Sequence, residues 1–572
     1  MLPDKTDGLV DPGRREVLAT GAALGAALGT GAALGTASGP AGAGTILRSP
    51  PTTPFLVPLP VYTPKAPVAA LMPPAGRLPS GQEAGRAAHQ RSADFVPKKC
   101  YELHVKPLQH SFHPELPTQT MWGYDGMLPG PTVVARYHEP VVVRIFNELP
   151  ANHVGYGSPE ISTHLHNAHC GSESDGFPGD FYSLAKQGPT LTAPGKYKDH
   201  LYPNVFAGAD QYPATKGDPR EALGTLWYHD HRLDFSAQNV YKGLAGFYLL
   251  FDEIDSGNEY DPNPKALRLP SGVGKYDIPL AIQDRQFDSG GYVAYDQFES
   301  DGLLGDKICV NGKVQPWFKV ERRKYRFRLL NASLARFYEF YLVNGSADQA
   351  FTYIANDGNL LPKPLQMTKI RIAPAERADL VIDFAQYPLG SKLYIVNKLE
   401  QLEGREPTGR LLLPGTQVLR FDVDDEPPLP DASRVPAALR ELPPVNLAEV
   451  VRTREWRFDR ANGVWTVNGK LFDIDRPAAT VKKGSAEIWV LRGGGEWHHP
   501  VHLHLEEFRI LSRNGAPPPP HEQGRKDVAV VRHDEVVRIF VRFRDYVGKY
   551  VMHCHNLTHE DHSMMLRFDI VA

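Results

Sequence analysis

Histidine occurs in closely spaced pairs in this 572-residue chain. Random placement of its 22 histidines predicts fewer than one pair of the form His-x-His, whereas the sequence contains four. In a β-strand, residues i and i+2 lie on one face about 7 Å apart, which suits ligands of neighbouring metal ions. The four pairs are His164 with His166, His229 with His231, His502 with His504, and His553 with His555.

These pairs lie in two separate regions of the chain. Between Arg232 and Trp497 there is no histidine at all. A metal site built from the pairs must therefore be shared by an N-terminal and a C-terminal module whose faces touch. The middle of the chain is excluded from it.

The last pair encloses a thiol. The sequence runs His553-Cys554-His555 and continues to His559 and Met564. Histidine, cysteine and a weak thioether ligand are the set that forms a blue copper centre. Because side chains alternate along a strand, Cys554 faces away from its two neighbours. One short covalent path then joins a copper held by Cys554 to coppers held by His553 and His555. Such a path suits electron transfer, and a zinc site would not need it.

Four segments of the chain resemble the copper motifs of the multicopper oxidase family. They are residues 164–166, 229–231, 499–504 and 553–564. The resemblance extends from about Tyr101 to Ala572 and is closest to three-domain bacterial laccases, spore-coat laccases and phenoxazinone synthase. It implies four copper ions, of which one is type 1, one is type 2 and two are type 3. The implied ligands are His499, Cys554, His559 and axial Met564 for type 1; His164 and His502 for type 2; His166, His229 and His555 for one type 3 copper; and His231, His504 and His553 for the other.

The resemblance also implies an activity. It predicts an enzyme that couples one-electron oxidation of phenolic or aminophenolic substrates to the four-electron reduction of dioxygen to water. We expect the small reducing substrate to dock at an exposed edge of His499 or His559. Asp175 and Glu560 match acidic positions that assist proton delivery in this family, and the alternative is that both are ordinary carboxylates. A bilirubin-type oxidase, or an oxidase of cuprous, ferrous or manganous ions, is the alternative function.

Two other classes of protein use similar residues. A zinc hydrolase can use paired histidines, but it would leave Cys554 unexplained. An electron carrier without oxidase activity needs only the type 1 set, so the eight further matched histidines argue against it. We interpret His498 and His562 as bystanders and Met565 as a core residue. His169 either approaches the metal cluster or is a surface or supporting histidine. Trp497 either lines the docking site, relays electrons or packs in the core.

The composition of the whole chain indicates a mainly β protein, whose strands would position these ligands. The chain contains 51 glycines and 51 prolines, which favours many turns. Recurring glycine turns before apolar runs indicate repeated β-sandwich modules. The expected fold is all-β, with three cupredoxin-like Greek-key β-sandwich domains at residues 97–255, 272–430 and 445–572. The linker between the second and third contains a predicted short helix, Ala437 to Leu442.

The N-terminal part of the chain is predicted to lie outside these domains. Residues 1–44, with Arg14-Arg15 before an Ala/Gly/Leu run, are typical of a twin-arginine export signal, which predicts a periplasmic or extracellular enzyme without stable membrane insertion. Residues 45–96 are rich in Pro, Ala and Gly and are expected to form a linker or wrapping arm.

Charge and cysteine content limit the partners. A formal net charge of -3 argues against nucleic-acid binding. Cys100, Cys170 and Cys309 allow at most one disulfide. The oligomeric state stays open.

Overall fold

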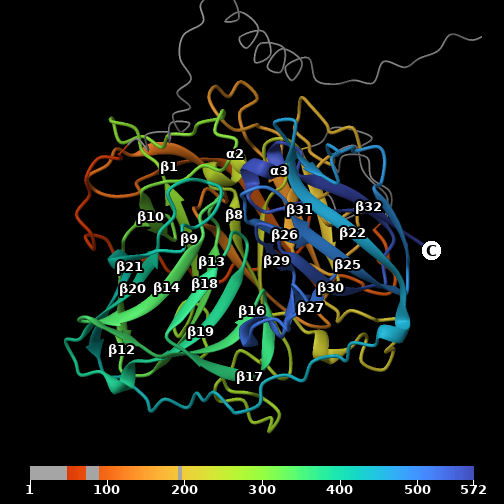
Figure 1. Ribbon diagram of the computed structural model, residues 1–572. Coiled ribbons are helices and arrows are strands. Elements are labelled where there is room, and N and C mark those ends of the chain that lie inside the picture. Colours follow the sequence, from red (N-terminus) through yellow and green to blue (C-terminus); the bar gives the residue numbers. More distant parts are fainter. Residues whose placement is uncertain (1–47, 73–88, 191–195) are drawn as a thin grey trace, which may run out of the picture. The chain divides into compact units, whose positions relative to one another are not determined.

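The computed structural model describes residues 48–72, 89–190 and 196–572. The predicted export signal at residues 1–44 lies outside the described residues. The strands of the described chain form six sheets, which pair into three sandwiches. This confirms the predicted all-β architecture. Figure 1 shows the third sandwich in blue beside the green strands of the second.

The first sandwich consists of two four-stranded sheets, in the orders β2-β1-β4-β6 and β3-β8-β7-β5. Apolar residues alternate along its strands, so Tyr101, Leu103 and Val105 of β1 point into one buried core. Its elements are β1 (Lys99–His110), β2 (Gln119–Tyr124), β3 (Gly130–Arg136), β4 (Val141–Asn147), β5 (Thr163–His166), β6 (Tyr197–Tyr202), β7 (Thr225–Asp230), the helix α2 (Ser236–Lys242) and β8 (Ala245–Phe251).

The second sandwich pairs a seven-stranded sheet with a six-stranded one. Their orders are β11-β10-β9-β13-β19-β16-β17 and β12-β21-β20-β14-β15, and the sixth strand of the latter, β18, pairs with β14. Its elements are β9 (Asp277–Arg285), β10 (Lys307–Val310), β11 (Lys313–Val314), β12 (Trp317–Glu321), β13 (Lys324–Asn331), β14 (Tyr338–Asn344), β15 (Ala347–Gln349), β16 (Phe351–Asn356), β17 (Asn359–Met367), β18 (Lys369–Ile372), β19 (Arg377–Asp383), β20 (Lys392–Leu399) and β21 (Leu411–Asp425).

The third sandwich pairs sheets in the orders β23-β22-β25-β30-β27-β28 and β24-β32-β31-β26-β29. Its helix α3 lies beside α2 of the first sandwich (Figure 1). Its elements are β22 (Val450–Ala461), β23 (Val464–Val467), β24 (Ala479–Lys482), β25 (Ser485–Gly493), β26 (His499–Leu503), β27 (Phe508–Arg513), β28 (Arg525–Lys526), β29 (Val528–Val531), β30 (Val536–Phe543), β31 (Gly548–Cys554), α3 (Leu557–Asp561) and β32 (Met565–Val571).

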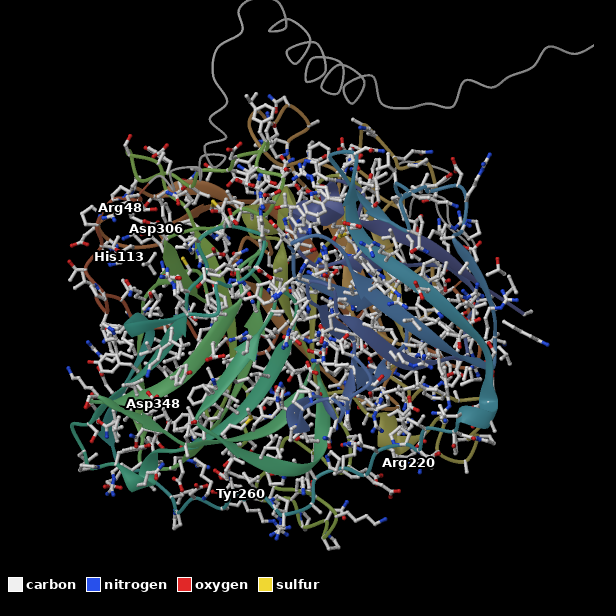
Figure 2. All side chains as sticks on the ribbon, viewed as in Figure 1. Arg48, His113, Arg220, Tyr260, Asp306 and Asp348 are labelled. Carbon is white, nitrogen blue, oxygen red and sulfur yellow. The ribbon has the colours of Figure 1, made fainter. Side chains whose placement is uncertain are left out.

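The described part of the Pro-rich segment is an arm that follows the sandwiches. Figure 2 labels Arg48, His113 and Asp306 near one another, where the described arm begins. The backbone N–H of Ser49 donates to Oδ2 of Asp306 at 3.0 Å, and Nε2 of His113 donates to the carbonyl of Thr53 at 2.9 Å. Further along, Leu59 is buried in the core of the second sandwich. A segment too poor in apolar residues to fold alone is thus ordered by the partners it finds on folded sheets.

Two sequence expectations need correction or completion. Residues 437–442 are not helical, and Leu439 instead packs into the core of the second sandwich. The neighbouring prolines of this segment favour extended backbone over a helix. All four cysteines are free thiols, so the chain forms no disulfide.

Within the described residues, no helix has both the length and the apolar character needed to cross a lipid bilayer.

Candidate metal centre

Eight histidines from the first and third sandwiches meet between them, all of them buried. They are His164, His166, His229, His231, His502, His504, His553 and His555. Antiparallel pairing sets them in register, since β5 places His164 opposite His229 of β7, and β26 places His502 opposite His553 of β31. Every pair that the spacing singled out therefore contributes to one cluster, which we call the histidine cluster.

The histidine cluster contains overlapping groups of three histidines, each close enough together to hold one metal ion. The nitrogens of His231, His504 and His553 lie within 4.8 Å of one another, and so do those of His164, His502 and His504. A third set joins His164, His166 and His229. The ring centroid of His555 lies 5.2 Å from that of His166 and 5.3 Å from that of His229. The structure thus brings together the residues that the resemblance assigns to the type 2 and type 3 ions.

Carboxylates and carbonyls hold the outer nitrogens of these rings. Nδ1 of His504 donates to Oδ2 of Asp175 at 2.7 Å, and Nδ1 of His502 donates to the carbonyl of Asp527 at 2.9 Å. Glu560 lies between two rings, with Oε1 at 2.9 Å from Nδ1 of His231 and Oε2 at 2.9 Å from Nδ1 of His553. Such contacts fix the tautomer, so that the lone pair of each ring points to the centre of the cluster.

Six ring nitrogens of the histidine cluster lack hydrogen-bond partners. Nε2 of His164, His229 and His502 and Nδ1 of His166 are buried without a hydrogen bond, as are both ring nitrogens of His555. Buried polar atoms are rarely left unpaired in a folded protein unless an ion or water satisfies them. A cluster of inward lone pairs is the arrangement that metal ions complete, so these residues fit copper.

Burial keeps the histidines neutral. It lowers the pKa of His164 well below the usual value, and the neighbouring His229 and His231 lower it further. Burial likewise lowers the pKa of His502 and His504. Near neutral pH each of these rings is uncharged, so its second nitrogen carries no proton that would compete with a metal ion. Burial also raises the pKa of Asp175, whereas the histidines facing Glu560 outweigh its burial and lower its pKa.

A second, smaller group lies on the other side of β31. Sγ of Cys554 is 3.6 Å from Nδ1 of His499 and 3.6 Å from Nδ1 of His559. Met564 is fully buried in the same core as Cys554, and its carbonyl accepts from the backbone N–H of Cys554 at 3.0 Å. Two histidines, a cysteine and a methionine are the donor set of a blue copper site. Burial raises the pKa of the Cys554 thiol, so a cation is required to hold the thiolate there.

Comparison with known proteins identifies the family to which this chain belongs. Multicopper oxidase family models match residues 105–191, 288–412 and 444–572. The chain belongs to the multicopper oxidase family. It is similar to a bilirubin oxidase of Albifimbria verrucaria, with 35% identity over 82% of this chain and 76% of the relative. It is also similar to a laccase of Bacillus subtilis, with 33% identity over 83% of this chain and 94% of the relative.

Solved structures agree with the family. The McoA multicopper oxidase of Aquifex aeolicus superposes with a TM-score of 0.68 and 25% identity, covering 84% of this chain and 97% of that one. The protein is therefore an oxidoreductase with the three-domain cupredoxin-like fold that the resemblance implied.

Two residues of the multicopper oxidase site were missed by sequence reasoning. Oδ1 of Asp527 accepts from Nε2 of His166 at 3.1 Å, and Arg377 of β19 donates from Nη1 to the same oxygen at 2.9 Å. Both side chains are fully buried. The second sandwich supplies no histidine but orients one through this ion pair. Neither residue belongs to a spaced motif, so no local signal in the sequence could have found them.

The remaining candidates lie outside the two groups. Nε2 of His169 pairs with Asp545 at 2.8 Å, and Nε2 of His498 pairs with Glu406 at 2.9 Å. His562 bonds its own helix through the carbonyl of Thr558 at 2.6 Å. Met565 packs in an apolar cluster with Phe177 and Val551.

The expected docking edge is absent. His499 and His559 are both 0% exposed, so neither of the two histidines that face Cys554 reaches the surface.

Proposed function

We propose that this multicopper oxidase couples the one-electron oxidation of phenolic or aminophenolic compounds to the four-electron reduction of dioxygen to two water molecules. The similarity to a Bacillus subtilis laccase over most of both chains supports this activity. The donor set supports four copper ions, with type 1 at His499, Cys554, His559 and Met564 and the other three in the histidine cluster. When bound, the ions supply one-electron redox steps and a binding place for dioxygen.

The observation that carries the proposal is the position of Cys554 on β31. Its thiol faces His499 and His559, while His553 and His555, on either side of it in the chain, face the histidine cluster. One peptide unit on each side of Cys554 thus connects the site that would accept electrons to the histidine cluster that would bind dioxygen. A hydrolase or an electron carrier has no use for this connection.

The chain's own residues have three tasks in this function. The histidines hold the ions, and Asp175, Asp527 and Glu560 orient the histidines. The two sandwiches exclude bulk water, since all eight cluster histidines are buried. Glu560 and Asp175 are also the carboxylates closest to the cluster rings in position to accept or release protons during dioxygen reduction.

Bilirubin-like pigments are the second candidate substrate class. The observation that favours them is the 35% identity to a bilirubin oxidase. The two candidates share the copper chemistry and differ only in the donor, so the same assay separates them.

The test is oxygen uptake by the fully copper-loaded protein with an aminophenol, bilirubin and cuprous ion as parallel donors. Rapid uptake with the aminophenol supports the laccase-like function, and uptake with bilirubin alone supports the pigment oxidase. Uptake with cuprous ion alone would reassign the protein to the metal-ion oxidases. A blue protein that consumes no oxygen with any donor would refute the oxidase function proposed here.

A further inference from the structure

The edge of His559 is closed by backbone. Its Nε2 donates to the carbonyl of Asp301 at 3.0 Å. Asn556, three residues earlier, also donates to that carbonyl, at 3.1 Å, and to the carbonyl of Gly404 at 3.4 Å. The segments around residues 301 and 404 therefore lie over the ring edge. A donor molecule that stays outside the protein cannot touch this histidine.

The face of His559 is covered by an indole. The ring of Trp465 in β23 stacks on it with a centroid distance of 3.7 Å and an interplanar angle of 26°. Trp465 is itself 1% exposed, and its Nε1 donates to the carbonyl of Ser300 at 2.8 Å. This is the shortest ring contact that either type 1 histidine makes among the described residues.

A second indole extends the stack to the surface. Trp497 lies edge-on to Trp465, with ring centroids 4.9 Å apart and an interplanar angle of 88°. Unlike Trp465, Trp497 is partly exposed. The aromatic order from solvent inward is thus Trp497, Trp465 and His559. We call the two indoles the tryptophan pair.

Two arginines fix the tryptophan pair. The guanidinium of Arg405 lies 5.1 Å from the ring centroid of Trp497, and that of Arg460 lies 5.3 Å from Trp465 and 5.9 Å from Trp497. Both arginines bond the carboxylate of Asp301, each at 2.9 Å. Cation–π contacts anchored by a shared carboxylate restrict the motion of both rings. The same Asp301 thus closes the edge of His559 and holds the arginines that order the indoles.

We propose that electrons enter this oxidase through the tryptophan pair, with the donor in contact with Trp497 and not with a type 1 histidine. This inference rests on the proposed oxidase function. One electron would leave the phenolic donor, whose proton would go to solvent. A copper held by His499, Cys554, His559 and Met564 would take up that electron by changing from the cupric to the cuprous state. The two indoles end in the state in which they began. Because the entry point lies at the surface, bulky phenolic donors react as readily as small ones.

The test measures the reduction of the type 1 site without oxygen. Copper-loaded wild type, Trp465→Phe and Trp497→Phe are mixed anaerobically with an aminophenol or with a soluble polymeric phenol, and the loss of blue absorption is followed. We expect both variants to keep the wild-type blue spectrum. We expect both to bleach about tenfold more slowly with either donor, which corresponds to ~1.4 kcal/mol in activation free energy. Trp456→Phe is the matched control, because Trp456 is buried in the same sandwich but packs on Trp489.

A second readout reports on position alone. Copper loading should quench tryptophan emission from wild type and from Trp456→Phe, and it should quench a smaller share in Trp465→Phe. A blue Trp465→Phe or Trp497→Phe protein that bleaches at the wild-type rate would overturn the proposal. If Trp465→Phe fails to bind copper, the more exposed Trp497→Phe decides. A wild type that is never blue, or that no donor bleaches, would instead refute the oxidase function.

Discussion

Nδ1 of His504 in the third sandwich donates a hydrogen bond to Oδ2 of Asp175 in the first, at 2.7 Å. The backbone carbonyl of the same aspartate accepts from Nδ1 of His164. One residue therefore sets the tautomer of two cluster histidines that come from different sandwiches. Burial raises the pKa of Asp175, so its carboxyl group takes up a proton more readily than an exposed one. The carboxyl group of Asp175 can therefore both orient His504 and supply a proton to the cluster.

Asp175→Asn should impair the histidine cluster without affecting the proposed type 1 site. We expect oxygen reduction to slow by about 10- to 100-fold, the range typical of lost contacts to metal-ligating histidines. The blue absorption should be unchanged, because Asp175 contacts no type 1 ligand. Reoxidation of pre-reduced enzyme by oxygen measures the first quantity. Glu173→Gln is the control, since Glu173 accepts from Gln90 and faces His89, which lies outside the histidine cluster. Wild-type reoxidation in Asp175→Asn would assign Asp175 a purely structural role.

Cys554→Ser tests the connection along β31. A hydroxyl cannot replace the thiolate as a soft copper ligand, so the blue absorption should vanish and donor oxidation should fall to background. The histidine cluster keeps all its ligands, so the loss of metal should be about one ion per chain. Absorption, copper analysis and oxygen uptake measure the three effects. Cys100→Ser, at a half-buried thiol away from both groups, should behave as wild type. Full turnover in Cys554→Ser would exclude the proposed electron route.

Arg377→Met tests the contribution of the second sandwich. It leaves the carboxylate of Asp527 buried without its cation, which costs ~3–5 kcal/mol in a protein interior. Denaturant unfolding of the copper-free protein should show this loss, and copper content should fall because Asp527 orients His166. Arg410→Met removes an exposed pair with Glu400 and should cost about 0–1 kcal/mol. Equal effects of the two substitutions would mean that the buried pair has no special role.

The sequence predicted the ligands better than their supports, for a physical reason. Ligands such as His164 and His166 are two residues apart because a strand places them on one face, and that constraint is local. Arg377 and Asp527 are 150 residues apart and meet only after the sandwiches pack. Trp465 likewise reaches His559 across a sandwich core. Local patterns also failed at residues 437–442, where a helix-forming composition is overridden by the burial of Leu439 in a neighbouring core.

His169 provides a pH test away from the copper ligands. Its Nε2 donates to Oδ2 of Asp545 at 2.8 Å. Burial alone would lower the pKa of His169, but the negative charges of Glu506 and Asp545 outweigh burial and raise it above 6.5. The folded protein thus binds this proton more tightly than the unfolded chain. The resulting stability is fully present below pH 6.5 and is lost as the pH rises through the folded pKa of His169.

His169→Gln should remove this contribution. We expect the variant to be about 2 kcal/mol less stable than wild type near pH 6, as for a buried hydrogen bond between charged groups. The difference should shrink toward pH 9, because the wild type loses the proton while the variant has none to lose. Unfolding of the copper-loaded proteins across this range measures it. A difference that grows with pH would mean that His169 is neutral in the folded protein, so that the negative charges around it do not outweigh its burial.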